Sequence, residues 1–152
     1  MVLKFLPKPN MAMLGIDYGA KKIGLAKSDD AGIMAMPLEV LRNTGEAAVQ
    51  QHIKQLCDEQ GITTIVVGVP VSLSSGSSTI NIRDVDLQNK QMQEVLAFIE
   101  QLKTAVAVPV VMEDERLSTQ MANRLRRDSD RKGSDDDVAA MLILQNYLDK
   151  LQ

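Results

Sequence analysis

Acidic residues follow two apolar segments of the chain and begin a third. Asp17 ends the apolar start of "LGIDYG", Glu115 closes the "EDE" that follows "VPVVM", and "GSDDD" at 133–137 precedes a run with helical spacing. Carboxylates that converge without cations repel one another and raise their pKa values. A bound divalent cation removes that cost, and an all-oxygen ligand set favours Mg²⁺ or Mn²⁺ over zinc. The acids therefore indicate a metal site, whose usual chemistry is phosphoryl transfer.

Helical periodicity separates the three acids of "GSDDD". Counting back from the apolar positions 140, 141, 144, 147, 148 and 151 places residues 136 and 137 toward the sheet and Asp135 toward solvent. A structural explanation also fits, because Ser134 and Asp137 match a capping box and acids suit a helix N-terminus. Asp17 could likewise cap the turn at Tyr18 and Gly19. Capping and metal binding both remain open at this point.

A local excess of positive charge lies between these acids. The chain has a net charge of -3, yet Asp128 and Asp130 are outnumbered over 116–132 by six basic residues: Arg116, Arg124, Arg126, Arg127, Arg131 and Lys132. This segment fits a solvated helix face. Beside an acidic metal site it also predicts a rim that holds nucleic-acid phosphates. Aromatic residues make up only 3% of the chain, which disfavours base stacking and favours recognition by shape.

The order of the predicted elements is strand, strand, strand, helix, strand, helix, strand, helix, helix. The strands are expected near 12–17, 22–28, 33–36, 62–70 and 108–112, and the helices near 45–60, 92–102, 118–127 and 135–151. Thr44 is the expected cap and Gly61 the expected end of the first helix, whose buried face includes Val49, Ile53, Leu56 and Cys57. This order predicts an α/β fold: a mixed five-stranded sheet, made of a three-stranded antiparallel meander plus two parallel strands, with helices on both faces.

Length and composition restrict the class of protein. A chain of 152 residues predicts one domain, 12–152, after a loose leader at 1–11. With Cys57 as the single cysteine and His52 as the single histidine, a disulfide framework and a Cys/His zinc site are excluded, and a reducing cytoplasm is expected. The serine-rich segment 72–84 fits a flap or a linker.

Four ordered blocks resemble the YqgF family of RuvX-type resolvases. They are "GIDYGAKKIGLAKSD", "IVVGVPVSLSSG", "DERLST" and "DDVAAMLILQNYLD", and together they span Met13 to Asp149. The resemblance implies an RNase H-like fold and a metal-dependent nuclease of the bacterial cytoplasm that matures the 5' end of pre-16S rRNA.

The resemblance also implies roles for individual residues. Asp17, Glu115 and Asp136 would be the catalytic acids and the ligands of Mg²⁺ or Mn²⁺ in a two-metal mechanism. Lys21, Lys22 and Arg116 would contact phosphates; the basic rim adds Arg124, Arg127, Arg131 and Lys132. Two departures stand out. Lys22 lies where an arginine is usual, and the fourth strand ends in "GVP" where related junction resolvases carry an acid.

Four functions are compared. The first is a phosphodiester hydrolase that acts on structured RNA, namely pre-16S rRNA in pre-ribosomal particles, as a monomer or weak homodimer. The second is a Holliday junction resolvase acting on branched DNA, which needs two coordinated sites and hence a dimer. The third is a non-catalytic rRNA-binding assembly factor, in which the acids are helix caps. The fourth is an actin-like or sugar-kinase-like ATPase, whose two domains exceed the length of this chain.

Overall fold

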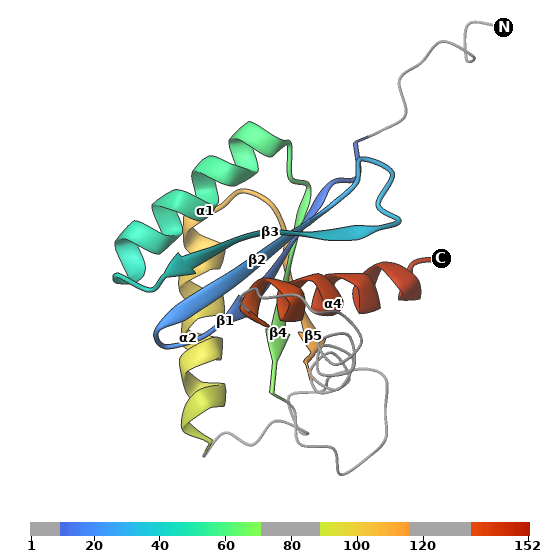
Figure 1. Cartoon of the computed structure of the whole chain (residues 1–152). Coiled ribbons are helices and arrows are strands. Elements are labelled where there is room, and N and C mark those ends of the chain that lie inside the picture. Colours follow the sequence, from blue (N-terminus) through green and yellow to red (C-terminus); the bar gives the residue numbers. More distant parts are fainter. Residues whose placement is uncertain (1–9, 71–88, 116–134) are drawn as a thin grey trace, which may run out of the picture.

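The computed structural model describes residues 10–70, 89–115 and 135–152, which form one five-stranded sheet in the order β3-β2-β1-β4-β5 with helices on both faces (Figure 1). The strands are β1 (Met13–Tyr18), β2 (Lys22–Ser28), β3 (Ala35–Arg42), β4 (Thr64–Val69) and β5 (Val110–Asp114), and the helices are α1 (Glu46–Gln60), α2 (Lys90–Ala105) and α4 (Asp135–Lys150). Strands β1 to β3 form an antiparallel meander, and β4 and β5 run parallel to β1. The predicted fold class is confirmed.

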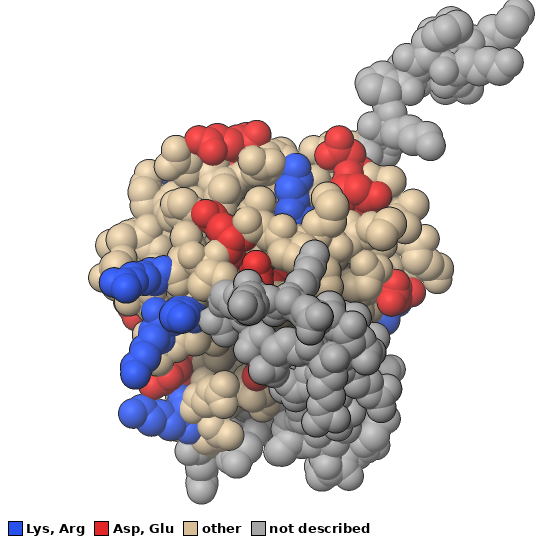
Figure 2. Space-filling view, in the orientation of Figure 1, with Lys and Arg blue, Asp and Glu red and all other residues tan. Residues whose placement is uncertain are grey.

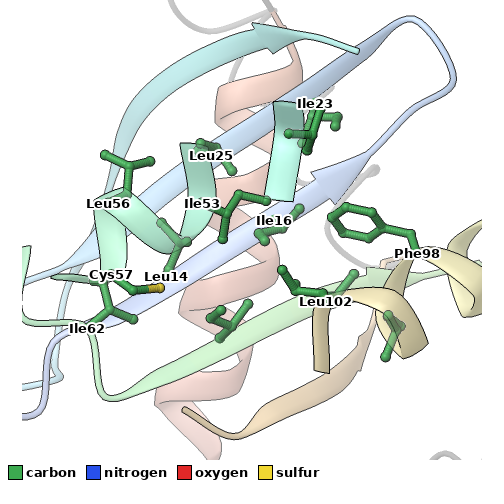
Figure 3. Packing of buried hydrophobic residues seen from close by; sticks show 14 of the residues in the cluster. Leu14, Ile16, Ile23, Leu25, Ile53, Leu56, Cys57, Ile62, Phe98 and Leu102 are labelled. Carbon is green, nitrogen blue, oxygen red and sulfur yellow. The ribbon is translucent and has the colours of Figure 1, made fainter. Parts of the chain in front are cut away.

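The two faces of the sheet carry different helices. Leu14 and Ile16 of β1 face α1 and α2, where the larger hydrophobic core lies (Figure 3). Met13 and Gly15 point to the opposite face, which α4 covers. We call these the α1–α2 face and the α4 face. Because side chains alternate along a strand, each residue of β1 can be assigned to one face or the other.

Helix α1 buries the residues that its periodicity predicts. Val49, Ile53, Leu56 and Cys57 all lie in the core. Burial, with the nearby charge of Asp58, raises the pKa of the Cys57 thiol to about 11, so the predicted core thiol is confirmed. The helix ends at Gly61, which has the left-handed φ of 64° that favours glycine at this position.

The predicted cap of α1 is wrong. The N-cap residue is Gly45, and no side chain caps this helix end. Thr44 instead belongs to the turn that follows β3, because its backbone N–H donates to the carbonyl oxygen of Arg42. The helix therefore begins one residue later than a threonine cap requires.

The third strand is longer and lies later than the predicted 33–36. Asp29 accepts hydrogen bonds from the backbone N–H groups of Ile33 at 2.8 Å and Met34 at 3.2 Å, which hold these residues in the turn and lower the pKa of Asp29. The strand then continues through Pro37. Proline is tolerated there because β3 is an edge strand, and a register shift between Leu25 and Ala26 accommodates it.

Two other predicted segments lie outside the described residues: the helix at 118–127 and the serine-rich segment 72–84. The boundary between leader and domain stays a prediction. Within the described part of the chain, no helix is long and apolar enough to cross a membrane.

Candidate active site at the carboxyl edge of the sheet

The carboxyl ends of the parallel strands β1, β4 and β5 form one edge of the sheet, which we call the carboxyl edge. Asp17 lies in β1 near this edge, opposite Gly24 of β2, and is half-buried. It shares the α4 face with Gly15, two residues earlier. The structure therefore places Asp17 on the face of the sheet that α4 covers.

Helix α4 packs directly on β1. A Cβ atom added to Gly15 would lie 2.7 Å from Cβ of Leu144 and 2.8 Å from the carbonyl oxygen of Ala140. No larger side chain fits without moving the helix.

The direction of α4 follows from its hydrogen bonds. The Gln145 side chain donates to the carbonyl oxygen of Ile33 and accepts from the backbone N–H of Ala35, both at 2.9 Å. Ala35 begins β3 and lies level with the amino end of β1. The first turn of α4, which contains Asp136, must therefore extend toward the carboxyl end of β1, as Figure 1 shows. For Asp136 itself, the structure describes the backbone position.

Glu115 follows β5 directly at the carboxyl edge. Its backbone N–H donates to the carbonyl oxygen of Val69 at 3.1 Å, and its Cβ lies 3.3 Å from the Cβ position of Gly68. Burial, followed by the negative charge of Asp114, raises the pKa of the Glu115 carboxyl. In the sheet register Asp17 is level with Gly68 and Glu113, so Glu115 lies two strands away and two residues further along, with about 12 Å between the two backbones.

The structure thus brings Asp17, Glu115 and the backbone of Asp136 to one edge. Among the described side chains, no group of three His, Cys, Asp or Glu residues could hold a metal ion. The side chain of Asp136 is not among the described side chains. The donor set at this edge is all oxygen, and the raised pKa of Glu115 indicates an environment in which a negative charge is costly. Both properties fit a hard divalent cation.

The sequence pattern did not reveal the structural role of Glu113. It placed the acids "EDE" after the fifth strand, whereas Glu113 and Asp114 belong to β5. Glu113 is buried, and its carboxylate accepts a hydrogen bond from Nζ of Lys150 at 2.5 Å. This ion pair ties the end of α4 to β5. The one signal in the sequence is that Glu113 lies two residues after Val111 and so shares the face of β5 that packs on the α4 core.

The predicted phosphate contacts Lys21 and Lys22 are both exposed at the β1–β2 hairpin. Gly19 permits this tight turn, because a Cβ atom at that position would lie 2.5 Å from the carbonyl oxygen of Lys22. The other predicted contacts lie outside the described residues: Arg116, Arg124, Arg127, Arg131 and Lys132.

Curated relatives match almost the whole chain. A protein of Clostridium acetobutylicum named "Putative pre-16S rRNA nuclease" is 38% identical over 146 residues, which cover 93% of this chain and 100% of the relative. A protein of Rickettsia typhi with the same name is 33% identical over 149 residues, covering 95% of this chain and 88% of the relative.

Solved structures of two resolvases share the fold. RuvC of Thermus thermophilus, in complex with a Holliday junction substrate, matches with a TM-score of 0.57 and 13% identity, over 93% of this chain and 95% of that chain. The fowlpox virus Holliday junction resolvase matches with a TM-score of 0.53 and 11% identity, over 93% and 100%. These matches support the RNase H-like fold. Residues 11–150 match the RuvX family, described as Holliday junction resolvase, and the chain therefore belongs to that family.

Proposed function

We propose that this protein is a metal-dependent nuclease that processes the 5' end of pre-16S rRNA in the cytoplasm. The observation that carries the proposal is the match to proteins bearing the pre-16S rRNA nuclease name, which extends over 93% of this chain and the full length of one relative. The proposal is supported by two acidic residues at the carboxyl edge, Asp17 and Glu115, whose carboxylates are of the kind that a metal-dependent phosphodiester hydrolase uses.

In this proposal Asp17, Glu115 and Asp136 hold Mg²⁺ or Mn²⁺. Bound there, two such ions would supply an activated water and stabilise the leaving oxygen of the phosphodiester. The fold supports this assignment in three ways: β1 presents Asp17 on the α4 face, α4 directs its first turn toward that residue, and the end of β5 presents Glu115. Lys21 and Lys22 then hold the phosphate backbone at the neighbouring hairpin.

The test is cleavage of a pre-16S rRNA fragment with its 5' extension by the purified protein, with Mg²⁺, with Mn²⁺ and with EDTA. We expect cleavage that requires the metal and that is lost in Asp136→Asn. Asp58→Asn serves as the matched control, since Asp58 is exposed on α1, on the other side of the sheet. Cleavage that survives Asp136→Asn would show that the assigned site is wrong.

A second candidate is a resolvase of four-way DNA junctions, which the description of the family favours. The same carboxylates would perform the same chemistry on branched DNA, but symmetrical cleavage requires two sites and hence a dimer. A four-way junction assayed in parallel separates the two. Paired nicks in the junction from a dimeric protein, with the RNA left intact, would select the resolvase.

A third candidate binds rRNA without cutting it. Here the acids would serve only as helix and turn caps, so Asp17→Asn would complement a depleted strain as well as the wild type. We expect this variant to fail in complementation while it still folds.

A further inference from the structure

Two positive side chains oppose each other at the end of the meander. Lys22 of β2 and Arg42 of β3 are register partners, which places their Cα atoms about 5 Å apart. Both are exposed. Like charges directly opposite each other on neighbouring strands destabilise a sheet, so this pair is unfavourable for the fold alone.

The pair lies on the same face of the sheet as Asp17. Asp17 is the register partner of Gly24, and Lys22 is two residues from Gly24 along β2, so all three point to the α4 face. Gly24 adds no side chain between them. The two cations are therefore the next row of side chains beyond Asp17, about 7 Å further along the strand.

Three of the other described cations have partners, whereas the exposed Lys21, Lys54 and Lys90 make no ion pair among the described residues. Lys27 donates to Gln60, Lys103 pairs with Glu100, and Lys150 pairs with Glu113. Within residues 10–70, 89–115 and 135–152, neither Lys22 nor Arg42 makes an ion pair. Figure 2 shows several Lys and Arg side chains at the left edge of the molecule, with acidic side chains beside them, on the side where Figure 1 places the β1–β2 hairpin.

The backbone beneath the pair is held firmly. The N–H of Asn43 donates to the carbonyl oxygen of Lys21 at 2.9 Å, and its side-chain amide donates to the carbonyl oxygen of Gly19 at 3.1 Å and the hydroxyl of Tyr18 at 3.3 Å. The Tyr18 ring in turn stacks on Phe98, with ring centroids 4.5 Å apart. The end of β3 and the hairpin are thus joined, so the backbone needs little ordering when an anion binds there, and the cost in conformational entropy falls on the two side chains.

We propose that Arg42, together with Lys22, binds the phosphate backbone of the nucleic-acid substrate beside the carboxyl edge. An anion between the two side chains would attract both of them and so offset their mutual repulsion. This inference rests on the proposed function, since it assigns two residues that would hold the substrate of that reaction next to Asp17. It adds Arg42, which no motif in the sequence singles out.

The test measures binding of the full-length protein to a fluorescent pre-16S rRNA fragment and to a four-way DNA junction, by anisotropy in EDTA over a range of salt concentrations. We expect Arg42→Ala to weaken binding to the substrate about 10-fold at low salt. The slope of log K against log salt should fall by about 0.7 to 0.9, as for one lost phosphate contact. Arg42→Lys should retain the slope. Lys54→Ala is the control, because Lys54 is an exposed cation of α1 on the other face.

Cleavage kinetics and stability distinguish a binding role from a structural one. Arg42→Ala should raise KM and leave kcat within about twofold, as expected for uniform binding, and it should melt no lower than the wild type because it relieves a like-charge pair. A wild-type protein that binds neither nucleic acid would overturn both this inference and the proposed function. A wild type that binds and cleaves, with Arg42→Ala unchanged, would overturn this inference alone. Poly-glutamate serves as a probe for an acidic protein partner. If Arg42→Ala binds RNA as the wild type does but no longer binds poly-glutamate, the pair would be assigned to such a partner and this inference would be overturned.

Discussion

Glu113 and Glu115 are two residues apart at the end of β5, yet their surroundings differ. Glu113 is buried, with its side chain 6% exposed, and its Oε1 lies 2.5 Å from Nζ of Lys150, the last residue of α4. Glu115 lies one row further, where burial and the charge of Asp114 raise its pKa. The fold thus neutralises the first carboxylate with its own cation and makes the charge of the second costly.

This difference separates an acid that holds the fold from the acid that we propose for catalysis. The Glu113–Lys150 pair fixes the end of α4 to β5, and Gln145 fixes the middle of the helix to the start of β3. The helix is therefore held at sites away from its first turn, which leaves that turn directed at the carboxyl edge. In our proposal, a divalent cation binds the ionised Glu115 carboxylate and so offsets the cost of its negative charge.

The largest expected effect is on catalysis by Glu115→Gln. If Glu115 is a ligand, this variant should lose cleavage by about 100-fold or more, since even residues that only orient metal ligands cost about 10- to 100-fold. The protein should remain folded. The measurement is the single-turnover cleavage rate in Mg²⁺. A rate within about threefold of the wild type would remove Glu115 from the site.

The second effect is on stability and concerns the other acid. Lys150→Met should lower the free energy of unfolding by about 2 kcal/mol, because it leaves the buried Glu113 carboxylate without its cation. Urea unfolding measures this. Lys103→Met is the control, since the Lys103–Glu100 pair is exposed, with side chains 49% and 75% accessible, and should contribute less than about 0.5 kcal/mol. Equal losses in the two variants would contradict a structural role for Glu113.

A third change acts on Gly68, which lies on β4 beside both glutamates. Gly68 is the register partner of Glu113, and a Cβ atom there would lie 2.3 Å from Cδ1 of Ile143 and 3.3 Å from Cβ of Glu115. Gly68→Ala should therefore destabilise the protein by about 1 kcal/mol, since the flexible end of Ile143 can shift. Cleavage at a temperature where the variant is folded should also fall. Unchanged stability and unchanged cleavage would show that α4 and Glu115 have more room than the structure gives them.

The smallest effect is a dependence of stability on pH in the metal-free protein. Because the pKa of Glu115 is raised in the folded state from its ordinary value of 4.5, its ionisation destabilises the fold as the pH rises. Glu115→Gln should therefore melt higher than the wild type at pH 7 in EDTA, and the difference should disappear below about pH 4.5. Thermal melts across this range test it. A variant that melts lower than the wild type at pH 7 would indicate that the charged carboxylate stabilises the fold.

Much of the fold could be predicted because local patterns and burial agree. The apolar stripe of α1 and the glycine at its end gave the correct helix. The close turn at Gly19 and the position of Asp17 near the end of β1 also follow from local residue types. The antiparallel meander and the two parallel strands agree as well, since parallel strands need helical crossovers.

Some errors arise from local side-chain contacts that residue periodicity does not encode, and others from contacts between residues distant in sequence. Asp29 holds Ile33 and Met34 in a turn, so the third strand begins later, and its proline is permitted only by its place at the edge of the sheet. The partner of Glu113 is Lys150, 37 residues away, which no local pattern indicates. Arg42 acquires its meaning only from the register that places it opposite Lys22.

The most direct test of the central claim is Mn²⁺ binding measured by electron paramagnetic resonance on the full-length protein. We expect the wild type and Asp58→Asn to bind Mn²⁺ alike, and Asp17→Asn, Glu115→Gln and Asp136→Asn each to bind it at least about 10-fold more weakly. Undiminished binding in all three variants, or no binding by the wild type, would contradict a metal site at the carboxyl edge of the sheet.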